Sequence, residues 1–159
     1  METSTSRSIT RTIPAPALWL GLGGLVPFFG LAGWIWIADG IAKQGLVVAL
    51  TAYAGVILAF MGGVHWGIAM RAERATAWGP MIVSVVPALI AWPAIVFLPP
   101  FGLGMMMAAF LLLLIYDVVL AGRGDLPTWY RHLRIVLTSG VELALAAGIW
   151  GYVTEAGPL

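Results

Sequence analysis

Five long runs of apolar residues, separated by short polar segments, dominate the pattern of this chain. The runs cover 15–37, 45–70, 80–98, 101–120 and 133–152. Each holds about the 20 residues that a helix needs to cross the roughly 30 Å hydrocarbon layer of a bilayer. A helix also satisfies its backbone hydrogen bonds within one segment, as a bilayer demands. The pattern therefore predicts an all-α fold, a polytopic membrane protein built as a bundle of five transmembrane helices.

The sequence outside these runs is short. We expect a flexible cytoplasmic tail over residues 1–13, a single transmembrane domain over 14–153 and a short periplasmic tail over 154–159. The chain is 61% hydrophobic and 9% charged, whereas soluble domains carry about 25% charged residues. One membrane-embedded bundle is the expected domain, and its third and fourth helices should form an antiparallel hairpin because almost no chain separates them.

Positive charge is distributed unevenly between the connecting segments. Seven of the eight Lys and Arg residues fall in alternate segments, and these are Arg7, Arg11, Arg71, Arg74, Arg123, Arg131 and Arg134. The other side of the pattern holds Lys43 alone. Because basic residues in short loops resist translocation, the arginine-rich segments should lie inside. This predicts a cytoplasmic N-terminus and a periplasmic C-terminus.

Small residues recur every four positions in the second run, at Gly55, Ala59, Gly63 and Gly67. Such a ridge lets the backbone of another helix approach closely. Packing within the bundle would use it, and so would a homo-oligomer or a larger membrane complex that docks there. The sequence leaves these alternatives open.

Three ionisable residues lie deep in the predicted spans, at His65, Asp117 and Glu142. A charge at the centre of a bilayer costs at least about 2.5 kcal/mol, so such residues mark candidate sites. At about 1.5 Å per residue from the arginine-rich edge, all three fall in the inner half of the membrane. With Thr138 and Ser139 of the fifth run, they form a candidate intramembrane polar cluster.

This cluster has two interpretations. In the structural one, Asp117 pairs with Arg131 or Arg134, His65 donates to a backbone carbonyl or to Glu142, and the set fixes the order of the helices. In the functional one, His65 and a carboxylate bind or relay protons, or hold a polar headgroup, because histidine titrates near neutral pH.

Other chemistries find little support in the sequence. The chain has no cysteine, which removes thiolate nucleophiles, zinc–thiolate sites and iron–sulfur clusters. A bis-histidine haem would need a second histidine at the depth of His65, whereas His132 lies at the interface. No nucleophile motif or phosphate-binding loop is present. We therefore expect no metal, no cofactor and no catalytic residue, and an enzyme is the less favoured class.

Several elements together resemble a known family. The most specific is Gly62-Gly63-Val64-His65-Trp66-Gly67, and the others are Pro87, Asp117 and the segment Trp129-Tyr130-Arg131-His132-Leu133-Arg134. They are similar to a small family of multi-span membrane proteins catalogued as a domain of unknown function, with bacterial members and a mitochondrial transmembrane relative. The resemblance implies a bacterial inner (cytoplasmic) membrane location and brings no assigned activity or catalytic residue.

Two functions follow as hypotheses. The first is a non-enzymatic accessory or assembly partner of a larger membrane complex, suggested by the small size and the small-residue ridge. The alternative is a small transporter or proton-linked carrier that uses His65 with Asp117 or Glu142. The expected surroundings are the lipid bilayer and other membrane proteins, and the basic inner face needs no nucleic acid to explain it.

Overall fold

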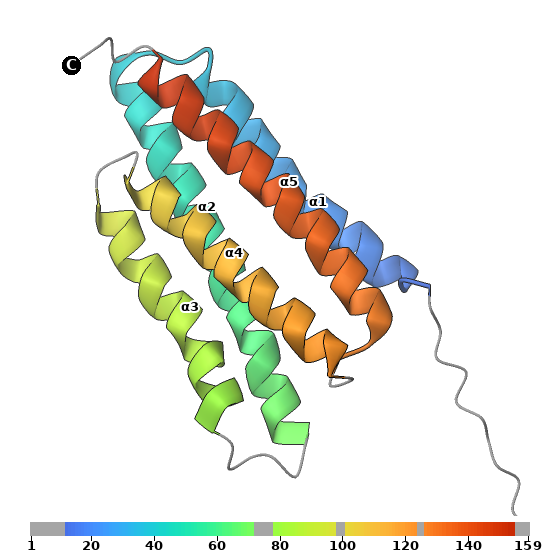
Figure 1. Cartoon of the computed structure of the whole chain (residues 1–159). Helices are drawn as coiled ribbons and strands as arrows, with labels where there is room; N and C mark the ends of the chain where they lie inside the picture. Colours follow the sequence, from blue (N-terminus) through green and yellow to red (C-terminus); the bar gives the residue numbers. More distant parts are fainter. Residues whose placement is uncertain (1–11, 72–77, 98–100, 124–125, 155–159) are drawn as a thin grey trace, which may run out of the picture.

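The computed structural model describes residues 12–71, 78–97, 101–123 and 126–154. Within them the chain forms five helices, which are α1 (Ala15–Ile35), α2 (Gly40–Arg71), α3 (Trp78–Val96), α4 (Phe101–Gly122) and α5 (Thr128–Val153) (Figure 1). All five are long and apolar enough to cross a membrane. The predicted all-α bundle of five spans is confirmed. Most of the two predicted tails lies outside the described residues, including Arg7 and Arg11. Arg74, in the connection between α2 and α3, also lies outside them.

Two helices begin five residues before the apolar runs that predicted them. Helix α2 begins at Gly40 rather than residue 45, and α5 begins at Thr128 rather than residue 133. Gly40 has a φ of 54°, a left-handed conformation that glycine adopts without steric cost, and it turns the chain from α1 into α2. The earlier starts place Lys43 and Arg131 inside helices, whereas the sequence pattern had assigned both to connecting segments.

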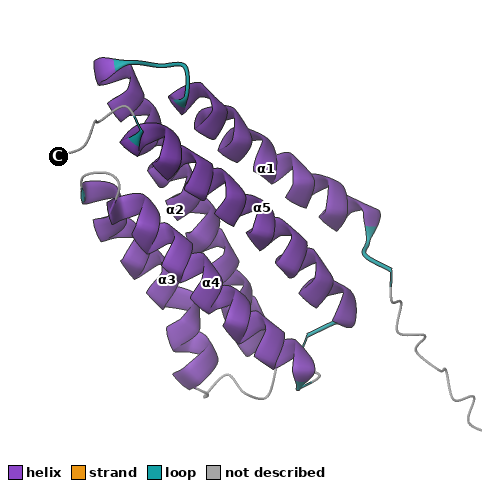
Figure 2. Cartoon of the chain, turned by 45° about the horizontal axis from the view of Figure 1, so that its top comes forward, coloured by secondary structure: helices purple, strands orange, loops and turns teal. Residues whose placement is uncertain are grey.

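Helix α2 is the centre of the bundle, because it contacts each of the other four helices. Helices α1 and α5 pack together on one side of it, and α3 and α4 pack together on the other (Figures 1 and 2). Helix α4 also contacts α5 and so closes the bundle. This arrangement brings one face each of α2, α4 and α5 together in the interior.

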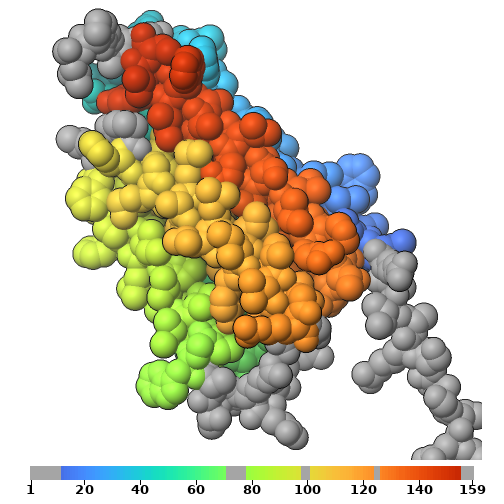
Figure 3. Space-filling view, in the orientation of Figure 1, coloured from blue at the N-terminus to red at the C-terminus, as the bar shows by residue number. Residues whose placement is uncertain are grey.

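The interior and the exterior are both apolar. Buried side chains from all five helices form the core, and the largest are Phe28, Phe110, Ile35, Leu50, Leu58, Leu103, Met106 and Leu145. Large apolar side chains also point outward, with Trp92 73% exposed and Leu143 66% exposed. Figure 3 shows the side chains of α3, α4 and α5 packed side by side over one face. Soluble proteins rarely expose so much apolar surface, and a bilayer supplies the missing contacts.

Close backbone contacts hold α3 in place. A Cβ atom on Gly62 would lie 2.8 Å from the carbonyl oxygen of Ser84 and 3.1 Å from Cγ of Pro87. A Cβ atom on Gly102 would collide with the carbonyl oxygen of Ala94. The first contact joins α2 to α3, and the second joins α3 to α4 as the antiparallel hairpin that the short connection predicted.

The ridge of small residues on α2 is divided between two environments. Gly55 is buried and faces Met106 of α4 and Ala91 of α3. A Cβ atom on Gly63 or Gly67 would have no neighbour within 4 Å among the described residues, and Gly63 is exposed. Internal packing therefore uses one end of the ridge and leaves the other facing outward.

Candidate functional site

Three helices bring a histidine, a carboxylate and an arginine together inside the bundle. Nε2 of His65 on α2 lies 2.9 Å from Oδ1 of Asp117 on α4. Nε of Arg134 on α5 donates a hydrogen bond of 2.5 Å to Oδ2 of the same carboxylate. The exposed fractions are 0% for His65, 1% for Asp117 and 2% for Arg134. Asp117 thus bridges two basic side chains in the interior.

The histidine keeps hydrogen-bonding capacity in this position. Its separation from Asp117 is that of an ion pair, but the angles do not meet those of a hydrogen bond, and neither ring nitrogen of His65 has a hydrogen-bond partner among the described residues. The ring of Tyr116 packs edge-on against the imidazole, with ring centres 5.1 Å apart. The imidazole is therefore positioned by packing and by the carboxylate, and neither of its nitrogens is committed to a hydrogen bond in the described part of the chain.

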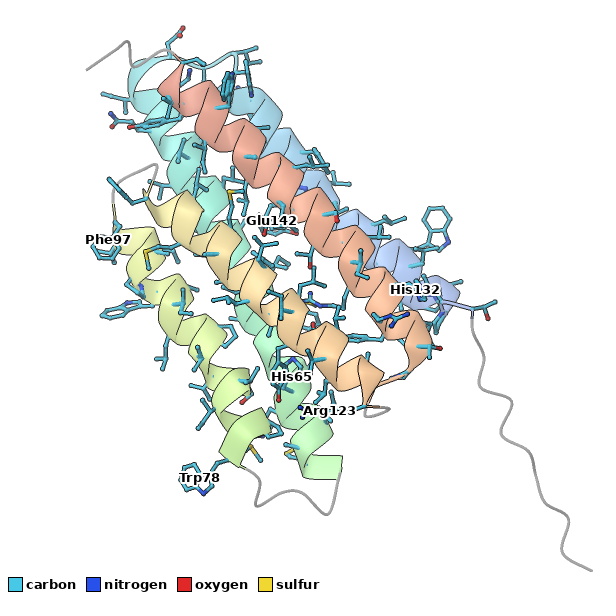
Figure 4. All side chains as sticks on the ribbon, viewed as in Figure 1. His65, Trp78, Phe97, Arg123, His132 and Glu142 are labelled. Carbon is cyan, nitrogen blue, oxygen red and sulfur yellow. The ribbon has the colours of Figure 1, made fainter. Side chains whose placement is uncertain are left out.

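A row of polar side chains continues from this triad along α5. Thr138 follows Arg134 by four residues and Glu142 follows by four more, so the three lie on one helix face. Thr138 is 1% exposed. Its hydroxyl and both carboxylate oxygens of Glu142 are buried without a hydrogen-bond partner in the described part of the chain. In Figure 4, Glu142 lies near the middle of the bundle, further along α5 from the level of His65.

The structure divides the candidate cluster that the sequence suggested. It brings His65 to Asp117 and Thr138 to the same buried face as Arg134, whereas Glu142 forms no ion pair with His65 among the described residues. Ser139 and Arg131 are exposed and lie outside the cluster. The buried polar face of α5 carries Arg134 and Thr138, and Ser139 lies about 100° further around the helix axis. Arg134 sets this face because it pairs inward with Asp117.

Residues of the family pattern meet across helices. Gly62 of α2 touches Pro87 of α3, and His65 belongs to the triad with Asp117 and Arg134. Trp129 and Tyr130 stack edge to face with ring centres 6.0 Å apart, and the Tyr130 hydroxyl is buried without a partner among the described residues. Trp66, Gly63 and Gly67 belong to the outward part of α2, where Trp66 is 47% exposed and Gly63 is also exposed.

Sequence reasoning missed a second polar contact, at the opposite end of the bundle. Lys43 is 5% exposed, and its Nζ donates a hydrogen bond of 3.1 Å to the carbonyl oxygen of Gly151. Nε1 of Trp36 donates a hydrogen bond of 3.1 Å to the carbonyl oxygen of Ala147. These carbonyls belong to the last turns of α5, where a cation is electrostatically favoured. The sequence pattern assigned Lys43 to a connecting segment because the residues before the second apolar run are polar, whereas the structure places it in α2.

The described residues offer little for metal binding. They include no group of three or more His, Cys, Asp or Glu side chains placed to hold an ion. Protein metal sites are usually built from several such ligands. What the triad can do chemically is take up a proton on His65 beside a carboxylate that already neutralises Arg134.

The sequence of this chain matches a family of known proteins. Residues 13–150 match the model of a family described as "Protein of unknown function (DUF3429)". The chain is 36% identical over 148 residues to transmembrane protein 69 of Xenopus tropicalis, covering 86% of this chain and 54% of the relative. It is 32% identical over 137 residues to transmembrane protein 69 of Mus musculus, covering 79% of this chain and 51% of that relative. The chain thus spans about half the length of these relatives, and no solved structure matches it significantly.

Proposed function

The chain belongs to the DUF3429 family of multi-pass membrane proteins of unknown function, and we propose that it is a small proton-linked carrier. The observation that carries this proposal is the buried bridge from His65 through Asp117 to Arg134. Ionisable side chains inside a membrane are expensive, and they mark proton and ion pathways in many transport proteins.

The charge of this site depends on one proton. With His65 neutral, the charges of Asp117 and Arg134 cancel, and with His65 protonated the triad carries one net positive charge. Because the three side chains are buried, that change in charge is poorly screened by solvent. Gain or loss of the proton is therefore able to favour different arrangements of α2, α4 and α5.

Glu142 provides a second group of the same kind. Its carboxylate oxygens are buried, and it lies two helical turns from Arg134 on the face that also carries Thr138. The acceptor beside His65 is Asp117, at 2.9 Å, and Glu142 would be a further acceptor along the polar row of α5. The row thus extends the triad toward the middle of the bundle (Figure 4).

Proton movement through the purified protein tests the proposal. We would trap the pH-sensitive dye pyranine inside proteoliposomes, impose a potassium diffusion potential with valinomycin, and record internal acidification between about pH 5 and 8, where histidine titrates. Wild-type protein should acidify the vesicles faster than protein-free vesicles do, and His65→Ala should return the rate to the protein-free level.

The other histidine supplies a matched control. His132 is exposed, and its Nδ1 lies 3.1 Å from the carbonyl oxygen of Thr128 on its own helix. His132→Ala should keep the wild-type rate. A wild-type rate equal to that of protein-free vesicles, or an unchanged rate in a folded His65→Ala variant, would overturn the carrier proposal.

The outward end of the α2 ridge favours a second candidate, an accessory or assembly partner of a larger membrane complex. Gly63 and Gly67 present a smooth surface with room for another helix backbone. Native purification in a mild detergent should then recover a partner at fixed stoichiometry, or a homo-oligomer, and Gly63→Leu should release it. A solitary wild-type chain in several mild detergents would count against this candidate.

Location and orientation complete the proposal. We place the protein in the inner membrane of a bacterium, with the N-terminus in the cytoplasm and the C-terminus in the periplasm. The asymmetry of Lys and Arg residues supports this orientation. Reporter fusions at Lys43 and Leu159 should be active in the periplasm and a fusion at Arg123 in the cytoplasm, whereas the reverse pattern would refute the orientation.

A further inference from the structure

A cavity of about 100 Å³ lies between α1, α2, α4 and α5, beside the triad. Leu20 and Gly24 of α1, Phe60 of α2 and Phe110 of α4 contribute apolar surface to it. Arg134 and Thr138 of α5 are the lining residues with a charged or hydroxyl side chain. The cavity is therefore amphipathic, with the polar groups gathered on one helix.

The polar wall has hydrogen-bonding capacity to spare. Arg134 uses Nε on Asp117, and its Nη1 lies 2.6 Å from Sδ of Met61. Its Nη2 and the hydroxyl of Thr138 are buried and have no hydrogen-bond partner among the residues that the structure describes. Both residues are at least 98% buried. A guanidinium and a hydroxyl together favour an acceptor, and most strongly an anionic one, because hydrogen bonds to ionised groups are about twice as strong as neutral ones.

The mouth of the cavity faces the surroundings of the bundle between α1 and α2. Two of its lining residues are largely exposed, Leu20 at 78% and Phe60 at 67%. Both belong to membrane-spanning helices, so the surroundings at this depth are lipid. At the cavity wall, the Tyr53 hydroxyl donates a hydrogen bond of 2.9 Å to the carbonyl oxygen of Gly24, a lining residue, and ties α1 to α2. A ligand would therefore enter sideways from the bilayer.

We propose that this cavity binds the anionic head of a membrane amphiphile, with the head on Arg134 and Thr138 and an acyl chain leaving between α1 and α2. A cavity of about 100 Å³ suits a carboxylate or phosphate head and the first few methylene groups, since one water needs about 10 to 15 Å³ of such water-accessible space. Water alone would satisfy the two polar groups but would leave the apolar wall hydrated. An amphiphile satisfies both parts of the wall at once.

This site goes beyond the carrier proposal, because binding of an amphiphile requires no movement of protons. It also differs from the groove between α3 and α4, whose larger cavity of about 230 Å³ is lined by apolar side chains and Tyr116. That groove offers an anion no buried cation. The amphiphile site is distinguished by the guanidinium of Arg134.

Photolabelling in lipid nanodiscs tests the site. We would use trace amounts of diazirine-labelled palmitate or diazirine-labelled phosphatidylglycerol and map the labelled peptides by mass spectrometry. Labelling should concentrate on the segments of α1, α2 and α5 around the cavity. The two probes share an anionic head, and the stronger label identifies the natural source as a free fatty acid or an anionic phospholipid.

Neighbouring glycines on α1 provide a blocking variant with its control. Gly24 lines the cavity, and a Cβ atom added there would meet nothing within 4 Å, so Gly24→Leu should fill the cavity without a backbone clash. Gly23 has the same open space but is exposed and lies outside the lining, so Gly23→Leu is the control. Gly24→Leu should lower labelling at least about tenfold, and Gly23→Leu should leave it unchanged.

Thr138→Val tests the head contact at nearly constant volume. Loss of one hydrogen bond should lower labelling by about threefold to tenfold without changing the thermal stability of the bundle by much. The methyl ester of the palmitate probe should label these segments weakly. Equal labelling by the ester, or full labelling of a folded Gly24→Leu variant, would overturn the proposal.

Discussion

At one end of the bundle, Lys43 and Trp36 each donate a hydrogen bond to a carbonyl oxygen of α5. We call this region the Lys43 end. In the other region, which we call the His65 half, the polar side chains are His65, Asp117, Arg134, Thr138 and Glu142, and buried polar atoms of all five have no hydrogen-bond partner among the described residues. Both regions join helices through buried polar groups, but only the second also leaves buried polar atoms of these side chains without a hydrogen-bond partner in the described part of the chain.

The difference shows what each region contributes. A donor paired with a helix-terminal carbonyl stabilises the fold and leaves nothing for a ligand. A buried polar atom without a partner costs free energy, and folded proteins retain such atoms where they serve another purpose. The Lys43 end is therefore interpreted as structural, and the His65 half as the site of proton and ligand chemistry.

The largest effect should come from Asp117→Ala. This change would leave Arg134 buried without its counter-ion, and breaking a buried ion pair in this way costs about 4 kcal/mol. The free energy of unfolding, measured by denaturant titration in detergent micelles, should fall by that amount. Ser139→Ala, at an exposed position on α5, is the control and should change it by less than about 0.5 kcal/mol.

Gly62→Ala should have the next largest effect. The added methyl group would press against the backbone oxygen of Ser84, which cannot move without shifting α3, so we expect a loss of about 3 kcal/mol. Gly63→Ala is the matched control on the same helix, because its added methyl group meets nothing within 4 Å. It should be neutral or stabilising by less than about 1 kcal/mol. Equal effects of the two variants in the same titration would refute the α2–α3 contact.

The smallest effect should come from Lys43→Met at the structural end. The variant keeps most of the side-chain volume but loses the hydrogen bond to the Gly151 carbonyl, which predicts a loss of about 1.5 kcal/mol. Proton flux should stay at the wild-type level. A Lys43→Met variant with the predicted free energy of unfolding but without proton flux would contradict the assignment of a purely structural role to the Lys43 end.

The sequence predicted the helices better than their partners. Span positions follow from local hydropathy, because about 20 apolar residues are enough to indicate a crossing. The choice of partner depends on tertiary packing, so Asp117 could equally have paired with Arg131 or Arg134 until the structure showed Arg134 turned inward. Residue counts predict the depth of a side chain along a helix, but they do not predict which way it points around the helix axis. For this reason the exposed Ser139 was included in the candidate cluster, and the role of Arg134 in lining the cavity was missed.

Lys43 also shows that local hydropathy does not reveal tertiary partners. Hydropathy began the second span after this residue, since a lysine and a glutamine lower the local average. The structure extends the helix back through Lys43 and places its ammonium at the carbonyl end of α5. A charge near a span boundary can therefore belong to the bundle, and only the neighbouring helix reveals its acceptor.

Removing all charge from the triad would separate a role in proton movement from a role in the fold. In the variant His65→Leu, Asp117→Leu, Arg134→Met, apolar side chains replace the buried ion pairs together, a change that is often neutral or stabilising by about 1 to 4 kcal/mol. We would measure the free energy of unfolding and the proton flux of the same preparation. We expect a bundle at least as stable as the wild type with flux at the level of protein-free vesicles. A variant that is more than about 2 kcal/mol less stable, or that retains proton flux, would show that the triad serves the fold instead.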